Sequence, residues 1–76
     1  MQEFKAVQQI LNKIKERESK YQQTWKRVPV RDLITVARLK TYRAEAMLDM
    51  DDKEKLLDDL VDAAAYLIFA IERVIQ

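Results

Sequence analysis

Three aspartates in the C-terminal third of the chain stand beside its longest apolar run. Asp58 and Asp59 precede this run, which covers residues 63–71, and Asp62 directly adjoins it. Spacings of three and four residues place these carboxylates on one side of a helix, within about one turn. Mg²⁺ typically binds one or two carboxylates and completes its octahedron with water and phosphate oxygens. The three aspartates are therefore candidate metal ligands.

Cations on the preceding segment are expected to face these aspartates. On a helical wheel Lys40 lies in the middle of the apolar arc of its helix, and Arg43 lies on the edge of that arc. The next loop is short, so the two helices should be antiparallel neighbours, with Arg38 level with Asp62 and Lys40 within about one turn. One interpretation is a buried ion pair, in which Lys40 or Arg38 neutralises Asp62 and fixes the register. The other is a site where the aspartates hold a divalent cation and Arg38, Lys40 and Arg43 bind phosphate.

Three helices must position these groups, and the sequence favours an all-α fold. Apolar residues recur at steps of three, four or seven in the first segment, which is the pattern of an amphipathic helix. Pro29 disfavours the α conformation at the residue before it, which predicts a connection over residues 21–30. The expected helices are residues 3–20, a second that starts between Val30 and Asp32 and ends at Leu48, and a third that has Asp51 or Asp52 as its N-cap and reaches almost to Gln76.

The composition bounds both the fold and the chemistry. The chain has 76 residues, of which 49% are hydrophobic and 36% charged, with one Pro and no Gly, which suits helices better than sheets or tight turns. It has neither Cys nor His, which excludes disulfides, thiolate nucleophiles, Cys/His zinc sites and imidazole bases. The apolar run is much shorter than the roughly 20 residues of a membrane span, and no signal peptide is visible. We therefore expect one soluble, cytoplasmic domain over residues 1–76.

The third helix is too apolar for one small chain to cover. From Leu60 onward, apolar residues occupy nearly every side of it, which is typical of a helix that is buried all round. Two other helices of the same chain leave part of that surface uncovered. We therefore expect this helix to pack against its copy in a homodimer or tetramer that forms a helix bundle.

Two aromatic residues of the connection have two interpretations. Trp25 and Tyr21 either pack over the open end of the bundle, as large aromatics do in a minimal core, or stack on a nucleobase. The first interpretation makes the connection structural. The second makes it part of a nucleotide-binding site.

Three short motifs resemble a known family. KYQQTW (Lys20–Trp25), KTYR (Lys40–Arg43) and DDLVDAAAY (Asp58–Tyr66) occur in this order and together resemble the nucleotide-modification-associated domain, a relative of the MazG-like all-α NTP pyrophosphatases. The resemblance spans residues 20–66. It implies a helical dimer or tetramer that binds nucleoside triphosphates, with Mg²⁺ held by an ExxE pair on one helix and an ExxD pair on the next. Asp59 and Asp62 match the ExxD pair, or Asp58 and Asp62 if the spacing is four.

The chain departs from this family at the first acidic pair, where Lys40 and Arg43 stand in place of two glutamates. Fewer carboxylates weaken a metal site, whereas two cations suit phosphate. The resemblance therefore implies NTP or dNTP binding, by either a Mg²⁺-dependent pyrophosphohydrolase or a degenerate relative of one. In the first case Asp59 would be the catalytic carboxylate that orients or deprotonates the attacking water.

Two other functions fit parts of the sequence. Residues 1–43 have 11 Lys and Arg against 4 Asp and Glu, whereas residues 44–76 have 3 against 9, which predicts that the two parts fold onto each other. The cations of the first part are dense enough for nonspecific nucleic-acid binding, but Glu16 and Glu18 interleave with them and no recognition motif stands out. We expect most of these cations to form a solvated face, and they are Lys13, Lys15, Arg17, Lys20, Lys26, Arg27 and Arg31. The second of these functions is a helical oligomerisation or protein-interaction module, because such a module would by itself explain the apolar third helix.

Overall fold

The computed structural model describes residues 4–76, and this part of the chain is helical with no β-strand. Its elements are α1 (Lys5–Tyr21), the short 3₁₀ helix η1 (Thr24–Arg27), α2 (Val30–Met47) and α3 (Lys53–Ile75). The predicted all-α class and the three predicted helices are confirmed. Residue 3, where the first helix was expected to start, lies outside the described residues. None of the described helices is long and apolar enough to cross a bilayer.

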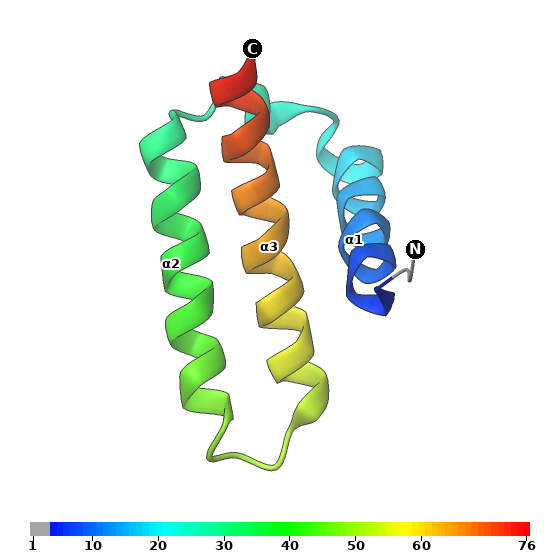
Figure 1. The fold of residues 1–76 in the computed structure, drawn as a ribbon, viewed down its shortest axis with the longest axis vertical. Helices are drawn as coiled ribbons and strands as arrows, with labels where there is room; N and C mark the ends of the chain where they lie inside the picture. Colours follow the sequence, from blue (N-terminus) through cyan, green and yellow to red (C-terminus); the bar gives the residue numbers. More distant parts are fainter. Residues whose placement is uncertain (1–3) are drawn as a thin grey trace.

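α3 is the central helix, with α2 along one side and α1 along the other (Figure 1). α2 and α3 form an antiparallel hairpin, as the short loop predicted. This loop ends at Asp52, whose side chain accepts a 3.0 Å hydrogen bond from the backbone N–H of Lys55. The bond satisfies one of the N–H groups that the first turn of a helix leaves unpaired. Asp52 is therefore the N-cap of α3, one of the two candidates predicted.

Backbone geometry at three positions turns the chain from α1 to α2. Gln22 ends α1 with a φ of 55°, in the left-handed region that usually falls to glycine, of which this chain has none. Pro29 precedes α2, and Val28 before it is extended, with φ −83° and ψ 132°. Between these points η1 brings Trp25 against α3, where its ring stacks on Phe69 with 4.9 Å between the centroids. The expectation that Trp25 packs over this end of the bundle is confirmed.

The core between the helices consists mainly of small side chains. Leu33 of α2 is completely buried and packs with Ala65, Phe69 and Ala70 of α3. The buried hydrophobic residues are Leu33, Ala37, Ala44, Val61, Ala63, Ala65, Phe69 and Ala70. Alanines let α2 and α3 approach closely, but each removes little apolar area from water.

α1 is a helix, as predicted, but its apolar stripe is not part of a buried core. Phe4, Val7 and Leu11 are exposed, and α1 contributes no buried residue. Of the residues of α1, only Ile10 and Ile14 pack against the core, and both are half-buried. The position of α1 therefore depends strongly on its polar contacts with α3.

Replacing Leu33 by alanine should remove the largest buried aliphatic side chain of this core. Its exposure is 0%, and a deleted buried side chain costs both its transfer energy and the cavity it leaves, so we expect a loss of about 2–4 kcal/mol in the free energy of unfolding. Leu39→Ala, at an exposed position of the same helix, is the matched control and should cost less than about 0.5 kcal/mol. Denaturation followed by circular dichroism measures both, and equal losses would contradict this packing.

Candidate functional site

Asp62 of α3 is the centre of the candidate site. Its side chain is only 5% exposed, and cations from both flanking helices surround it. Lys40 of α2 places Nζ 3.3 Å from Oδ2. Arg17 of α1 donates a hydrogen bond from Nη2 to Oδ1 at 3.2 Å, and Nζ of Lys13, also on α1, lies 3.9 Å from Oδ1. We call these four residues the Asp62 cluster.

The other two predicted aspartates are paired as well. Asp58 accepts a 2.7 Å hydrogen bond from Nζ of Lys13. Asp59 is buried, and Nη2 of Arg43 lies 3.7 Å from its Oδ1. Helix geometry explains the division, because successive positions turn Asp58 toward α1 and Asp59 toward α2, with Asp62 between them. All three carboxylates therefore have Lys or Arg partners.

These pairings do not fit a resident Mg²⁺ ion. Mg²⁺ requires oxygen ligands in near-ideal octahedral geometry, whereas Asp58, Asp59 and Asp62 already hold ammonium or guanidinium groups. Within residues 4–76, no group of three or more acidic side chains is arranged to hold a metal ion. Asp59, the residue predicted to act on the attacking water, has Arg43 as its partner. A magnesium or catalytic role for these residues stays a prediction.

The three cations predicted for phosphate binding do not all reach the aspartates of α3. The predicted ion pair between Lys40 and Asp62 is present, and Arg43 reaches Asp59 from an exposed position. Arg38, expected to lie level with Asp62, is exposed, because its place on the helical wheel turns it away from α3. Two of the three predicted cations are therefore brought to the aspartates.

Sequence reasoning missed the two cations that α1 contributes. Lys13 and Arg17 are four residues apart and share a side of α1 with Ile10 and Ile14, the residues that pack against the core. The sequence pattern alone predicts a solvated face for both. Their spacing next to the apolar positions, in a chain with a basic first part and an acidic second part, was the signal that would have found them.

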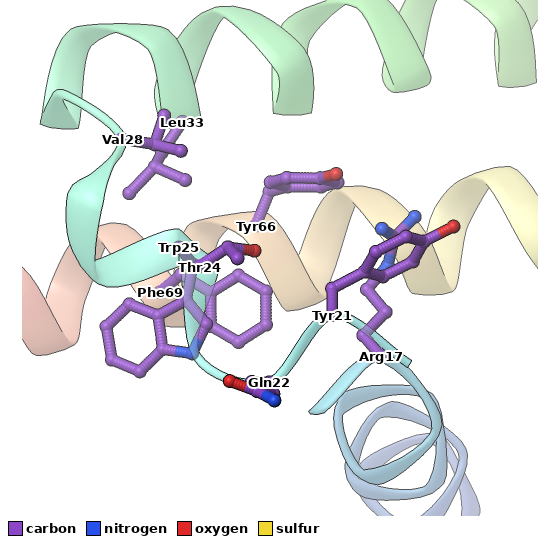
Figure 2. A pocket seen from close by; sticks show the side chains of 9 residues that line it. All are labelled: Arg17, Tyr21, Gln22, Thr24, Trp25, Val28, Leu33, Tyr66 and Phe69. Atoms are coloured by element: carbon purple, nitrogen blue, oxygen red, sulfur yellow. The ribbon is translucent and has the colours of Figure 1, made fainter. Parts of the chain in front are cut away.

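A pocket lies beside the Asp62 cluster, where the end of α1, η1, the start of α2 and α3 meet (Figure 2). It encloses about 270 Å³, and Arg17 is its one charged residue. We call it the aromatic pocket. Its lining residues are Arg17, Tyr21, Gln22, Thr24, Trp25, Val28, Leu33, Tyr66 and Phe69. Both residues predicted for base stacking, Tyr21 and Trp25, thus belong to one pocket.

Polar donors in this aromatic surrounding are only partly paired. The guanidinium carbon of Arg17 lies 5.0 Å from the ring centroid of Tyr66, a cation–π contact. Nε of Arg17 and Nε1 of Trp25 are buried and have no hydrogen-bond partner within residues 4–76, which is costly for buried donors. Trp25 stacks on Phe69, and Nζ of Lys26 lies over its ring, 5.7 Å from the centroid, whereas Tyr21 is exposed. The pocket therefore offers a planar ligand an aromatic wall, with a cation at its edge.

The contact between α1 and α3 shifts two pKa values. The hydrogen bond from Lys13 is the main cause that lowers the pKa of Asp58 below its usual 3.8, and the charges of Lys13, Lys40 and Arg17 act in the same direction against partial desolvation. The same hydrogen bond raises the pKa of Lys13 above its usual 10.5, against partial desolvation and with help from the charge of Asp62. The pair therefore contributes its full stability between these two usual values.

Acid should weaken the docking of α1 on α3. Because folding lowers the pKa of Asp58, its contribution is complete above pH 3.8 and is lost as the pH falls through the lower folded-state value. The aspartate is largely exposed, so we expect a total effect below about 1 kcal/mol. Asp58→Asn should flatten the acid limb of the curve of unfolding free energy against pH, and Asp51→Asn, at an exposed loop position, is the control. An acid limb that Asp58→Asn leaves unchanged would contradict the pairing.

Comparison with known proteins assigns no family to this chain. No family model matches it, and neither a curated protein nor a solved structure does. The resemblance to MazG-like proteins stays a hypothesis based on three short motifs.

Proposed function

We propose that the chain binds a nucleoside phosphate, with the base in the aromatic pocket and the phosphates beside the cations of the Asp62 cluster. The observation that carries this proposal is the position of Arg17, which lines the aromatic pocket and also hydrogen-bonds Asp62. A planar group in the pocket would have a cation directly at its edge. An NTP or dNTP combines these two parts, an aromatic base and a polyanionic chain.

The composition and size of the aromatic pocket support the proposal that the base binds there. Pockets for whole drug-sized ligands measure about 300–1,000 Å³, so a pocket of about 270 Å³ suits a base whose sugar and phosphates lie outside. Tyr21, Trp25 and Tyr66 supply aromatic rings, and such rings can stack on any of the nucleobases.

The excess of cations over carboxylates supports the position of the phosphates. Lys13, Arg17 and Lys40 face two carboxylates, those of Asp58 and Asp62, and the three cationic side chains keep 20% to 27% exposure. Arg17 bonds Asp62 through one of its five N–H donors. Guanidinium groups bind phosphate oxygens through two donors at once. The cluster can therefore attract a phosphate without losing its own ion pairs.

Binding without a metal is the form of this proposal that the pairings favour. A Mg²⁺-dependent pyrophosphohydrolase needs carboxylates for its metal, and Asp58, Asp59 and Asp62 are each paired with a cation. Nonspecific nucleic-acid binding has less support, because two of the cations on which it depends, Lys13 and Arg17, contact α3.

The sole tryptophan makes nucleotide binding directly measurable. Trp25 lines the aromatic pocket, so titration with a panel of NTPs and dNTPs should give saturable fluorescence changes without Mg²⁺. Arg17→Gln should weaken binding about tenfold, since it removes one charge-assisted contact of roughly 1.5 kcal/mol. Lys15→Gln removes the same charge from an exposed position of α1 and should leave the affinity close to that of the wild type. If the wild type gives neither a fluorescence change nor a calorimetric heat of binding, the proposal is contradicted.

Asp62→Asn distinguishes metal-free binding from a metal site by the sign of its effect. The asparagine keeps an oxygen that can accept from Arg17, so in a variant that keeps the wild-type fold the loss of a negative charge beside the phosphates should strengthen binding, by about 3- to 10-fold. If Asp62 held Mg²⁺, the same substitution would abolish Mg²⁺-dependent binding and any pyrophosphate release. Loss of binding by a variant with a wild-type helical spectrum and unfolding midpoint would therefore refute metal-free binding.

A further inference from the structure

The side of α3 that faces away from the Asp62 cluster carries a continuous apolar stripe. The residues repeat in alternating steps of three and four, which is the heptad pattern of a coiled-coil seam. We call it the α3 stripe, and it consists of Leu57, Leu60, Ala64, Leu67, Ile71 and Val74. The five large side chains among them are 44% to 73% exposed. The described part of the chain therefore leaves this seam largely uncovered.

Helix geometry explains why neither α1 nor α2 covers the α3 stripe. At 3.6 residues per turn, Ala64 and Ile71 lie roughly opposite Asp62 on the helix. α1 and α2 approach α3 from the side of the aspartates, through the pairs Lys13–Asp58 and Arg43–Asp59. Figure 1 shows the two helices on either side of α3. The 23 residues of α3 thus form a helix with one charged side and one apolar side.

The extent of the α3 stripe is typical of an interface. Monomeric proteins rarely expose contiguous apolar patches larger than a few hundred Å². Five large, roughly half-exposed side chains along one helix, continued on one edge by Ile68 and Ile75, reach this size. A specific interface needs roughly 600 Å² from each partner at its lower limit. The α3 stripe supplies most of that area by itself.

We propose that the α3 stripe binds the α3 stripe of a second copy of this chain, with the two helices antiparallel. In this arrangement the facing pairs between the copies are Leu57 with Val74, Leu60 with Ile71, and Ala64 with Leu67. The smallest residue of the stripe, Ala64, then receives a leucine. In a parallel pair Ala64 would face its own copy and leave a gap in the middle of the seam. Antiparallel helices also oppose their dipoles, and the interface has two-fold symmetry.

The proposed dimer keeps the interface apart from the proposed nucleotide site. The two α2–α3 hairpins would meet through their central helices, while the Asp62 cluster and the aromatic pocket remain on the outer sides. This proposal rests on the exposed heptads alone. Its test therefore does not depend on nucleotide binding.

Disulfide trapping tests the direction of the two helices, since the chain has no cysteine of its own. In the antiparallel dimer Ala64 of one copy faces Leu67 of the other, so Ala64→Cys mixed with Leu67→Cys should form disulfide-linked mixed dimers under mild oxidation. Leu57→Cys alone should not, because its two copies would lie roughly 25 Å apart. Leu57→Cys mixed with Val74→Cys should give the mixed dimer. Efficient linkage of Leu57→Cys to itself would overturn the antiparallel arrangement.

Sedimentation equilibrium tests the association itself. The wild type should have twice the 9.0 kDa mass of one chain, and Leu67→Glu should be a monomer that keeps its helical spectrum. Ile71→Lys is a second, independent variant with the same expected result. Leu39→Glu, at an exposed position of α2 outside the stripe, is the matched control and should stay dimeric. A wild type of 9.0 kDa, or a dimer that survives both stripe substitutions, would overturn the proposal and leave the stripe to a different partner.

Discussion

The almost complete removal of the Asp62 carboxylate from water is the constraint on which the arrangement of the helices depends. Burying a carboxylate costs several kcal/mol unless cations pair with it, and these cations come from α2 through Lys40 and from α1 through Lys13 and Arg17. α1 buries no residue of its own, so its few apolar contacts cannot by themselves fix its place. Asp62 therefore joins the three helices, and the same pairing sets the cation at the edge of the aromatic pocket.

α3 combines two different repeats in one helix. Asp58, Asp62 and Tyr66 follow one another at steps of four and face the partners from α1 and α2, whereas the α3 stripe repeats by heptads on the other side. Because the two repeats lie on opposite sides of one helix, the polar chemistry and the exposed apolar surface do not compete for space. The apolar run over residues 63–71 is therefore divided. Part of it packs inside the chain, and part remains exposed.

The sequence predicted the helices and the contacts within the α2–α3 hairpin, but it did not predict how α1 docks on α3. The helices, the N-cap at Asp52 and the pairing of Lys40 with Asp62 follow from periodicity and from a short loop that sets the register of a hairpin. The docking of α1 on α3 joins residues 45 positions apart, and no short loop sets its register, so the pattern of α1 by itself predicts solvated cations at Lys13 and Arg17. The aromatic pocket depends in turn on the positive φ of Gln22. A glycine would have predicted such a backbone turn, but this chain has none.

The alanine-rich core explains why the uncovered α3 stripe matters for stability. A chain of this length buries only roughly 60% of its unfolded surface, and here five of the eight buried hydrophobic residues are alanines, which remove little apolar area from water. The leucines and isoleucines of the stripe stay in contact with solvent. Packing them against a second copy would bury apolar area that one chain cannot bury alone. Folding and association are then linked, and the stability of the fold rises with protein concentration.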